Sequence, residues 1–212
     1  LGEPDGLLAV GGGYSPERLG AASRRGIFPW SSDDEPILWW CPRPRMVLPP
    51  GEVTVGRSLQ KAIRRAPYRI TMDTAFEAVM RGCAAAPRPG QEGTWITEGL
   101  IEGFCALHEE GLAHSVEACE EEALVGGLYG LAIGRVFCGE SMFARRPDAS
   151  KIAFVTLARH LSRWGFDLID CQQATEHLRR FGGREIELEA YLGRLEAGLR
   201  GRWRRGRWAV EG

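Results

Sequence analysis

The sequence predicts an α+β protein in which a mixed β-sheet packs against helices. The main observation is a run of three segments between residues 113 and 144 that reads as consecutive antiparallel strands with hairpin connections. Segments with helical periodicity come before and after this run, and Phe166–Gln172 reads as a further short, buried strand. The composition, 44% hydrophobic and 26% charged, is ordinary for a globular protein and argues against disorder.

The length of the chain limits the number of domains. At about 150 residues per domain, 212 residues fit one domain, or one domain with a small companion. We expect the division at Pro49-Pro50-Gly51, with a small β-rich domain over residues 1–50 and a larger mixed-sheet domain over residues 51–212.

The small domain is predicted by its turn chemistry. A short strand leads into glycines 11–13, and Ser15-Pro16 is typical of a helix start, with a capping hydroxyl before a proline. That helix is expected to end at Gly26. Residues 27–50 hold six prolines and three tryptophans, and proline at this density excludes a helix and suits short edge strands and turns.

The segment Gly56–Ile70 predicts an amphipathic helix with a purely cationic outer face. It carries five basic residues and no acid. Four of the basic residues fall within an arc of about 100° on the helix: Arg57, Lys61, Arg64 and Arg65. A solvated surface and a polyanion-binding surface are both open interpretations, although the lack of acids for i,i+4 pairs weakens the first.

The remaining elements are expected in this order: a helix over 71–82, a Pro/Gly loop over 84–93, a helix over 98–110, the three strands, a helix over 149–164, the strand Phe166–Gln172 and a helix over 175–181. From about residue 199 the chain continues as a basic tail. Between Arg200 and Trp208 the tail has five arginines, two tryptophans and no acid.

Metal sites, disulfides and membrane segments are not expected. The six cysteines are at least fourteen residues apart, so reduced thiols in a cytoplasmic protein are the simplest interpretation, and the four histidines form no HExxH or HxH spacing. No apolar run approaches the ~20 residues that span a bilayer, and no signal-peptide pattern opens the chain. Because the chain starts at Leu1 rather than Met, we expect some N-terminal sequence to be missing.

The order of elements matches, in broad outline, acyltransferases of the GNAT type. Those enzymes bind coenzyme A through a glycine-rich loop that opens the helix after the central strand. The corresponding segment in this chain, Phe143–Ala149, contains no glycine, so a backbone cradle for phosphates is missing. A GNAT-like scaffold is therefore expected without coenzyme A as cofactor.

Polar residues inside the apolar strands are the candidates for chemistry. Asp170 and Gln172 are two apart on one strand and face the same way, and Glu140 lies in the segment FCGESMF. Buried polar groups need partners or a substrate, so a structural hydrogen-bond network and a catalytic site both fit. Leu128, Phe137 and Met142 form either an apolar slot or plain core.

The chain resembles the leucyl/phenylalanyl-tRNA–protein transferases. The matching segments occur in the family's order between Glu3 and Gln172: EPDGLLAVGG, RRGIFPW, PILWWCP, GTWIT, HSVEAC, LVGGLYG, RVFCGESMF, ASK and LIDCQ. The resemblance implies transfer of Leu or Phe, and less readily Met, from aminoacyl-tRNA to proteins that begin with Arg or Lys. The product carries a destabilising N-terminus for proteolysis, and the family uses no metal and no coenzyme A.

The resemblance also implies roles for single residues. Asp170 and Gln172 match the family's proposed catalytic pair, and Glu140 matches a residue near the aminoacyl group. The other implied residues are Trp30 and Trp95 for stacking on the terminal adenosine, Leu128, Phe137, Met142 and Phe154 for the aminoacyl slot, and Arg57, Lys61, Arg64 and Arg65 for tRNA. The chain departs from the family in Gly13-Tyr14 and in its Arg/Trp tail. The two tryptophans could equally be core residues.

Two alternatives stay open at this point. One is a coenzyme A-dependent N-acyltransferase on the same scaffold, against which the missing glycine loop speaks. The other is a non-catalytic tRNA-binding protein that uses the basic helix and the Arg/Trp tail.

Overall fold

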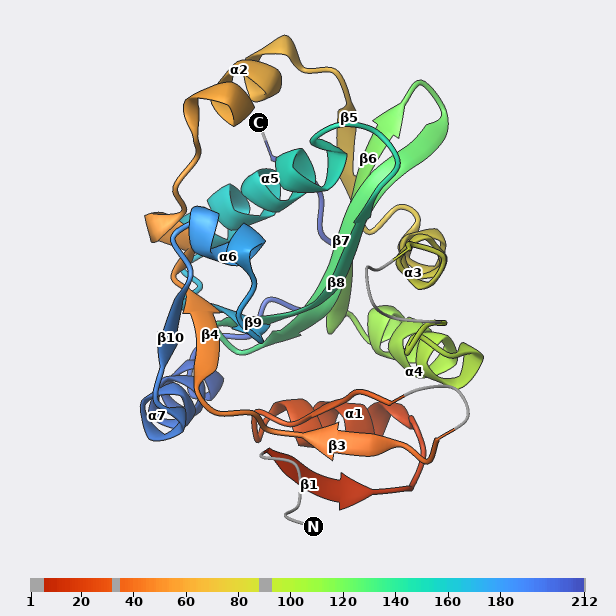
Figure 1. Ribbon diagram of the computed structural model, residues 1–212, viewed down its shortest axis with the longest axis vertical. Helices are drawn as coiled ribbons and strands as arrows, with labels where there is room; N and C mark the ends of the chain where they lie inside the picture. The colour runs from red at the N-terminus through yellow and green to blue at the C-terminus, as the bar shows by residue number, and fades with distance from the viewer. Residues whose placement is uncertain (1–5, 32–34, 88–92, 212) are drawn as a thin grey trace.

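A computed structural model describes residues 6–31, 35–87 and 93–211 of the chain. It contains a three-stranded sheet and a seven-stranded sheet, with the small sheet at the lower end of the molecule in Figure 1. The strands are β1 (Leu7–Val10), β2 (Phe28–Pro29), β3 (Leu38–Trp40), β4 (Arg45–Leu48), β5 (Arg69–Met72), β6 (Ala113–Glu120), β7 (Ala123–Ile133), β8 (Val136–Ala144), β9 (Leu168–Gln172) and β10 (Arg184–Ile186). The helices are α1 (Pro16–Ser23), the 3-10 turn η1 (Pro50–Glu52), α2 (Arg57–Arg65), α3 (Phe76–Ala84), α4 (Glu98–Glu109), α5 (Ala149–Arg163), α6 (Glu176–Arg180) and α7 (Leu188–Leu199).

The small sheet has the order β1-β3-β2, and all its pairs are antiparallel. Helix α1 starts as expected, because the Ser15 hydroxyl accepts a hydrogen bond from the Arg18 amide at 3.3 Å. The helix ends at Ser23 rather than at Gly26. Gly26 has a φ of +73° and completes the turn that redirects the chain into β2.

Strand β4 belongs to the large sheet, although residues 1–50 were expected to form one small β-rich domain. It pairs with β9 on one side and with β10 on the other, and Met46, Val47 and Leu48 are fully buried. The prolines that indicated an edge position, Pro44 and Pro49, lie outside the paired residues and therefore interrupt no ladder hydrogen bond.

The large sheet has the order β10-β4-β9-β8-β7-β6-β5. The three predicted antiparallel strands are β6, β7 and β8, and the predicted helix α5 leads into β9, which pairs parallel to β8. The chain thus forms a mixed sheet, as the sequence predicts. The strand glycines permit close packing: a Cβ on Gly126 would lie 2.6 Å from the Ala149 Cβ at the start of α5.

A helix was expected over residues 71–82, and the predicted start of this helix was wrong. Residues 69–72 form β5, which pairs antiparallel with β6, and α3 starts only at Phe76. Asp73 separates the two with a φ of +56°, a left-handed conformation that the apolar pattern of the sequence does not reveal. The loop expected over residues 84–93 lies partly outside the described residues.

Helices cover both faces of the large sheet (Figure 1). Helices α3 and α4 pack on one face, and α5, with α2 and α6 beside it, lies on the other. Each face has its own hydrophobic cluster, the first built around Phe104 and Tyr129 and the second around Phe137 and Phe154. Within the described residues, none of the helices has the length and apolar character needed to cross a membrane.

Candidate active site

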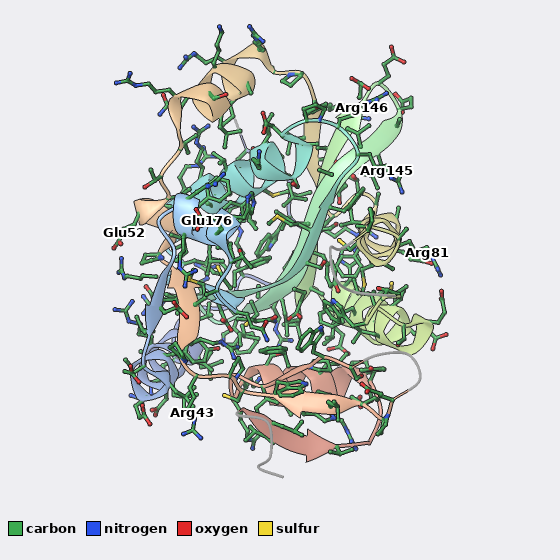
Figure 2. All side chains as sticks on the ribbon, in the orientation of Figure 1. Arg43, Glu52, Arg81, Arg145, Arg146 and Glu176 are labelled. Carbon is green, nitrogen blue, oxygen red and sulfur yellow. The ribbon has the colours of Figure 1, made fainter. Side chains whose placement is uncertain are left out.

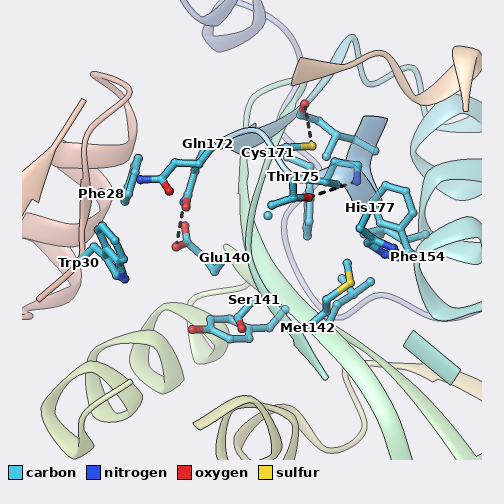
Figure 3. Close-up of a pocket in the computed structure, with 18 of the residues that line it drawn as sticks. Phe28, Trp30, Glu140, Ser141, Met142, Phe154, Cys171, Gln172, Thr175 and His177 are labelled. Carbon is cyan, nitrogen blue, oxygen red and sulfur yellow. Dashed lines mark hydrogen bonds between the residues drawn. The ribbon is translucent and has the colours of Figure 1, made fainter. Parts of the chain in front are cut away.

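The parallel strands β8 and β9 separate after a short paired stretch, and a pocket lies where they part. Pairing covers only Val136–Cys138 on β8 and Leu168–Asp170 on β9. Beyond it, residues 139–142 of β8 and residues 171–172 of β9 line a cavity of about 490 Å³ (Figure 3). Backbone groups and side chains at the carboxyl ends of two parallel strands therefore converge on one space.

One end of the cavity is an apolar slot. It is lined by the four residues expected there, Leu128, Phe137, Met142 and Phe154. Leu157 and Ile169 complete the lining, and Figure 3 shows Met142, Phe154 and His177 gathered at this end. Burial, with the nearby charges of Lys151 and Arg180, lowers the pKa of His177, so its imidazole stays neutral beside the apolar side chains. The slot suits an unbranched or aromatic apolar side chain.

The opposite end of the cavity is bounded by aromatic residues from outside the large sheet. Phe28 and Trp30 come from the small sheet, and Trp95 comes from the segment before α4. Trp30 is 40% exposed and meets the Trp40 ring edge-on at 6.1 Å. Such exposure is unusual for a core tryptophan and favours a stacking surface at this position.

A carboxyl group and an amide meet at the point where the strands part. The Gln172 side chain donates a hydrogen bond to Glu140 at 3.1 Å, drawn as a dashed line in Figure 3. Burial raises the pKa of Glu140 to about 7, against the opposing effect of the Gln172 hydrogen bond. Gln172 has a φ of +62°, a strained backbone for a residue other than glycine, which is a frequent feature of functional sites.

Asp170 lies behind the pocket rather than on its wall. The Arg45 guanidinium donates to both carboxylate oxygens, with Nε at 2.8 Å from Oδ1 and Nη2 at 2.7 Å from Oδ2. The Tyr191 hydroxyl donates to Oδ2 at 2.7 Å, and the Gln172 backbone amide donates to Oδ1 at 2.9 Å. A carboxylate has about four acceptor positions, and these four bonds use them all.

Sequence reasoning missed the partners of Asp170. Arg45 precedes it by 125 residues and Tyr191 follows it by 21, so no local spacing links them. The sequence shows only that an aspartate inside an apolar strand requires a cation or hydrogen-bond donors. It does not show which of the 27 lysines and arginines supplies the cation. Phe28, which the Arg45 guanidinium approaches to 5.0 Å, was missed for the same reason.

The predicted basic helix forms as α2 but ends at Arg65 rather than at Ile70, because residues 69–72 belong to β5, and it lies away from the pocket. Figure 1 places it above α5, and Figure 2 shows nitrogen-tipped side chains projecting outward from it. Leu59 and Ile63 pack against the cluster beneath. The four expected cations, Arg57, Lys61, Arg64 and Arg65, are all exposed. Within the described part of the chain, no ion pair to any of these four is found.

The mixed sheet opens into an apolar slot with a carboxyl group and an amide at the opening, an arrangement able to hold an apolar group beside polar side chains. Sequence comparison identifies the protein as an aminoacyltransferase. The chain belongs to the leucyl/phenylalanyl-tRNA protein transferase family. The family's sequence model matches residues 47–196, and the model of the family's N-terminal domain matches residues 12–43.

Individual relatives agree with this assignment. A leucyl/phenylalanyl-tRNA–protein transferase of Anaeromyxobacter sp. is 57% identical over 211 residues, covering 100% of this chain and 90% of the relative. The leucyl/phenylalanyl-tRNA–protein transferase of Myxococcus xanthus is 53% identical over 206 residues, covering 97% of this chain and 88% of the relative. Among solved structures, L-PGS from Bacillus licheniformis aligns with a TM-score of 0.44 and 11% sequence identity. The alignment covers 78% of this chain and 58% of the L-PGS chain.

Proposed function

We propose that the enzyme transfers Leu or Phe, and less readily Met, from aminoacyl-tRNA to the N-terminal α-amine of proteins that begin with Arg or Lys. The observation that carries the proposal is the cavity that joins an apolar slot, the Glu140–Gln172 pair and an exposed indole, in a chain of this family. The product is marked for proteolysis. We place the reaction in the cytoplasm, where aminoacyl-tRNA is made.

The reaction needs positioning more than activation, because an aminoacyl ester is already reactive. The α-amine nitrogen of the acceptor forms a bond to the ester carbonyl carbon, the bond from that carbon to the ribose oxygen breaks, and a proton passes from the amine to the leaving oxygen. An α-amine has an ordinary pKa of about 7.7–8.0, so a useful fraction is neutral near pH 7. Holding amine and ester together supplies most of the rate gain.

The side chains divide this work. Gln172 and Glu140 touch the space that the ester occupies. Gln172 orients the amine, and Glu140, whose pKa is raised to about 7, accepts the amine proton and passes it to the leaving ribose oxygen. Asp170 acts through Gln172: with its acceptor positions filled, it holds the Gln172 backbone in place. Backbone donors near the opening stabilise the oxyanion.

Binding of the tRNA is shared between two places. Trp30 and Trp95 stack on the terminal adenosine, an interaction worth ~1–3 kcal/mol per base. The cations of α2 contact phosphates of the tRNA body, with little dependence on base sequence. In addition, we assign the large sheet to the GNAT-like class, supported by its three antiparallel strands followed by a helix and a parallel strand that diverges at the site.

The reaction is tested by mass spectrometry of two short peptides, one beginning with Arg and one with Ala. Each is incubated with the enzyme and Leu-charged tRNA, with acetyl-coenzyme A in a parallel tube. A leucine increment on the Arg peptide alone is expected. Acetylation without leucine transfer would favour a coenzyme A-dependent N-acyltransferase, and tRNA binding that ignores charging, without any transfer, would indicate a binding protein.

The assignment of the pair is tested by Asp170→Asn and Gln172→Ala, both expected to lose activity while remaining folded. Asp167→Asn is the matched control, because Asp167 is about half exposed and pairs with Arg135 on the surface. Near-normal turnover in both site variants would contradict the assignment of Asp170 as a positioning residue and of Gln172 as a catalytic residue.

A further inference from the structure

The Arg/Trp tail folds back onto the enzyme and divides its two tryptophans between different surroundings. Trp203 stays half-buried, with the Arg24 guanidinium 5.3 Å from its ring. Further on, the Gly206 amide donates to the Gly111 carbonyl at 3.3 Å, at the turn between α4 and β6. Trp208 then enters the cluster beneath α5 and is 3% exposed.

Hydrogen bonds fix the tail on both sides of the buried indole. The Trp208 backbone amide donates to Asp73 at 2.7 Å, and Asp73 is itself held by the Ser115 amide at 2.9 Å. Three residues after Trp208, the Glu211 amide donates to His160 at 2.9 Å, and its carboxylate accepts from the Trp164 indole at 3.1 Å. The Trp208 ring is therefore held at a defined place and not merely packed against apolar surface.

That place adjoins the wall of the aminoacyl slot. The Trp208 ring stacks on His114 at 3.6 Å and lies 6.1 Å from the Phe137 ring, centroid to centroid. Phe137 also lines the slot, and it shares one hydrophobic cluster with Trp208 and with the slot residues Leu128 and Phe154. The tail thus reaches the substrate pocket through a single aromatic layer.

Phe137 has no freedom on the side of strand β7. Its ring lies over Gly130, where a Cβ would come within 2.6 Å of the Phe137 Cζ. The ring is bounded by Gly130, by the slot and by Trp208. Removing the indole would open space on one side only, and Phe137 would move into that space and away from the slot, because empty volume in a core is costly.

We propose that Trp208 sets the width of the aminoacyl slot by holding Phe137 in place, which makes the tail a determinant of side-chain selectivity. The inference rests on the proposed function, since it concerns which aminoacyl group that site accepts. It also assigns Trp208 a role inside the protein in place of RNA contact, since the indole is enclosed on every side that a nucleic acid would approach.

The test compares Trp208→Ala and Trp208→Leu with the matched controls Trp203→Ala and Trp203→Leu. Each full-length variant transfers Leu and Phe from charged tRNA to an Arg-initial peptide, and kcat/KM is measured for both. The ratio of kcat/KM for Phe to kcat/KM for Leu is expected to rise roughly tenfold in Trp208→Ala and less in Trp208→Leu. A change of this size corresponds to the discrimination that an apolar pocket achieves for about one methylene group or more. Both controls should keep the wild-type ratio.

Folding of each variant is checked by circular dichroism, and Trp208→Leu carries the test if Trp208→Ala does not fold. An unchanged ratio in a folded Trp208 variant overturns the inference, as does an equal loss for both amino acids, which marks a purely stabilising residue. Absence of transfer by the wild-type enzyme is a different outcome, because it contradicts the proposed function itself.

Discussion

Glu140 and Asp170 are two carboxyl groups on adjoining strands with opposite surroundings. Asp170 accepts four hydrogen bonds, two of them from a guanidinium. Glu140 receives one from an amide and otherwise faces an apolar cavity. In the proposed mechanism this contrast separates their tasks: Asp170 holds its neighbours in place, and Glu140, whose pKa is raised to about 7, exchanges a proton.

Glu140 makes stability depend on pH. Because burial raises its pKa from 4.5 to about 7, the native state keeps a proton between these pH values that the unfolded chain releases. The free energy of unfolding therefore falls as pH rises through this window. Glu140→Gln should flatten that fall and be more stable than wild type at pH 8 by about 2–3 kcal/mol, measured by urea unfolding at pH 4.5 and pH 8. Parallel curves for both proteins would show that folding does not raise the pKa of Glu140.

Arg45 should contribute strongly to stability because it neutralises a buried charge. Arg45→Ala leaves the buried Asp170 carboxyl group without its cationic partner, and we expect the free energy of unfolding to fall by ~3–5 kcal/mol in chemical denaturation. Arg81→Ala serves as the control: Arg81 pairs with Glu77 and Glu98 at the surface and projects outward from α3 in Figure 2, so little change is expected. Similar losses in both variants would contradict this difference.

At the scale of single elements, local pattern and distant pairing determined what the sequence could predict. Strands β6, β7 and β8 follow one another along the chain and form consecutive antiparallel pairs, so they were predicted correctly. Strand β4 pairs with β9 and β10, more than a hundred residues away, and β5 reads as helix until its pairing with β6 is known. Long-range pairing leaves no local signal, which limits such predictions.

The same limit applies to the site. Short motifs identified eight of the twenty residues that line the cavity, including Glu140, Gln172 and Trp30. They could not place Asp170 behind the wall, because its position depends on Arg45 and Tyr191. The Arg/Trp tail reads only as a basic segment, since nothing in its composition indicates that Trp208 is buried and Trp203 is not.

Two helical glycines show how packing decides the effect of one substitution. In α3, a Cβ on Gly82 would lie 2.5 Å from the Phe143 ring, so Gly82→Ala should destabilise the protein by ~1–3 kcal/mol despite better helix propensity. In α7, Gly193 has nothing within 4 Å, and Gly193→Ala should stabilise by ~0.5–1 kcal/mol. Thermal unfolding of both variants checks the opposite signs, and a stabilising Gly82→Ala would show that Phe143 moves freely.

At the scale of the whole molecule, the net charge is small, but positive charge is concentrated on one helix. The formal net charge is -1, so attraction to a polyanion has to come from a local surface such as α2. Figure 2 shows further surface charges, among them Arg145 and Arg146 beyond β8 and Glu52 in η1. A balanced total with one cationic helix favours contact in a defined orientation.

Arg64→Ala with Arg65→Ala should weaken tRNA binding and make its salt dependence less steep, by about 1.5 in the slope of log K against log salt concentration for two lost phosphate contacts. Reaction with a small aminoacyl-nucleoside analogue should be unchanged. Arg200→Ala is the control, because Glu196 already neutralises this exposed arginine. Equal loss with tRNA and with the analogue would contradict the division between helix and pocket.

The apolar lining of the slot has a consequence for hydrolysis of the aminoacyl ester, which competes with transfer. Water attacks the same ester carbonyl as the amine does, and each hydrolysed molecule wastes one charged tRNA. In the proposed reaction, a cavity walled by Leu128, Phe137, Met142 and Phe154 would limit the access of water to the ester carbonyl carbon. The ratio of transferred to hydrolysed aminoacyl group is thus a property of this lining, and a wider slot would lower the yield per charged tRNA even where the rate of transfer is kept.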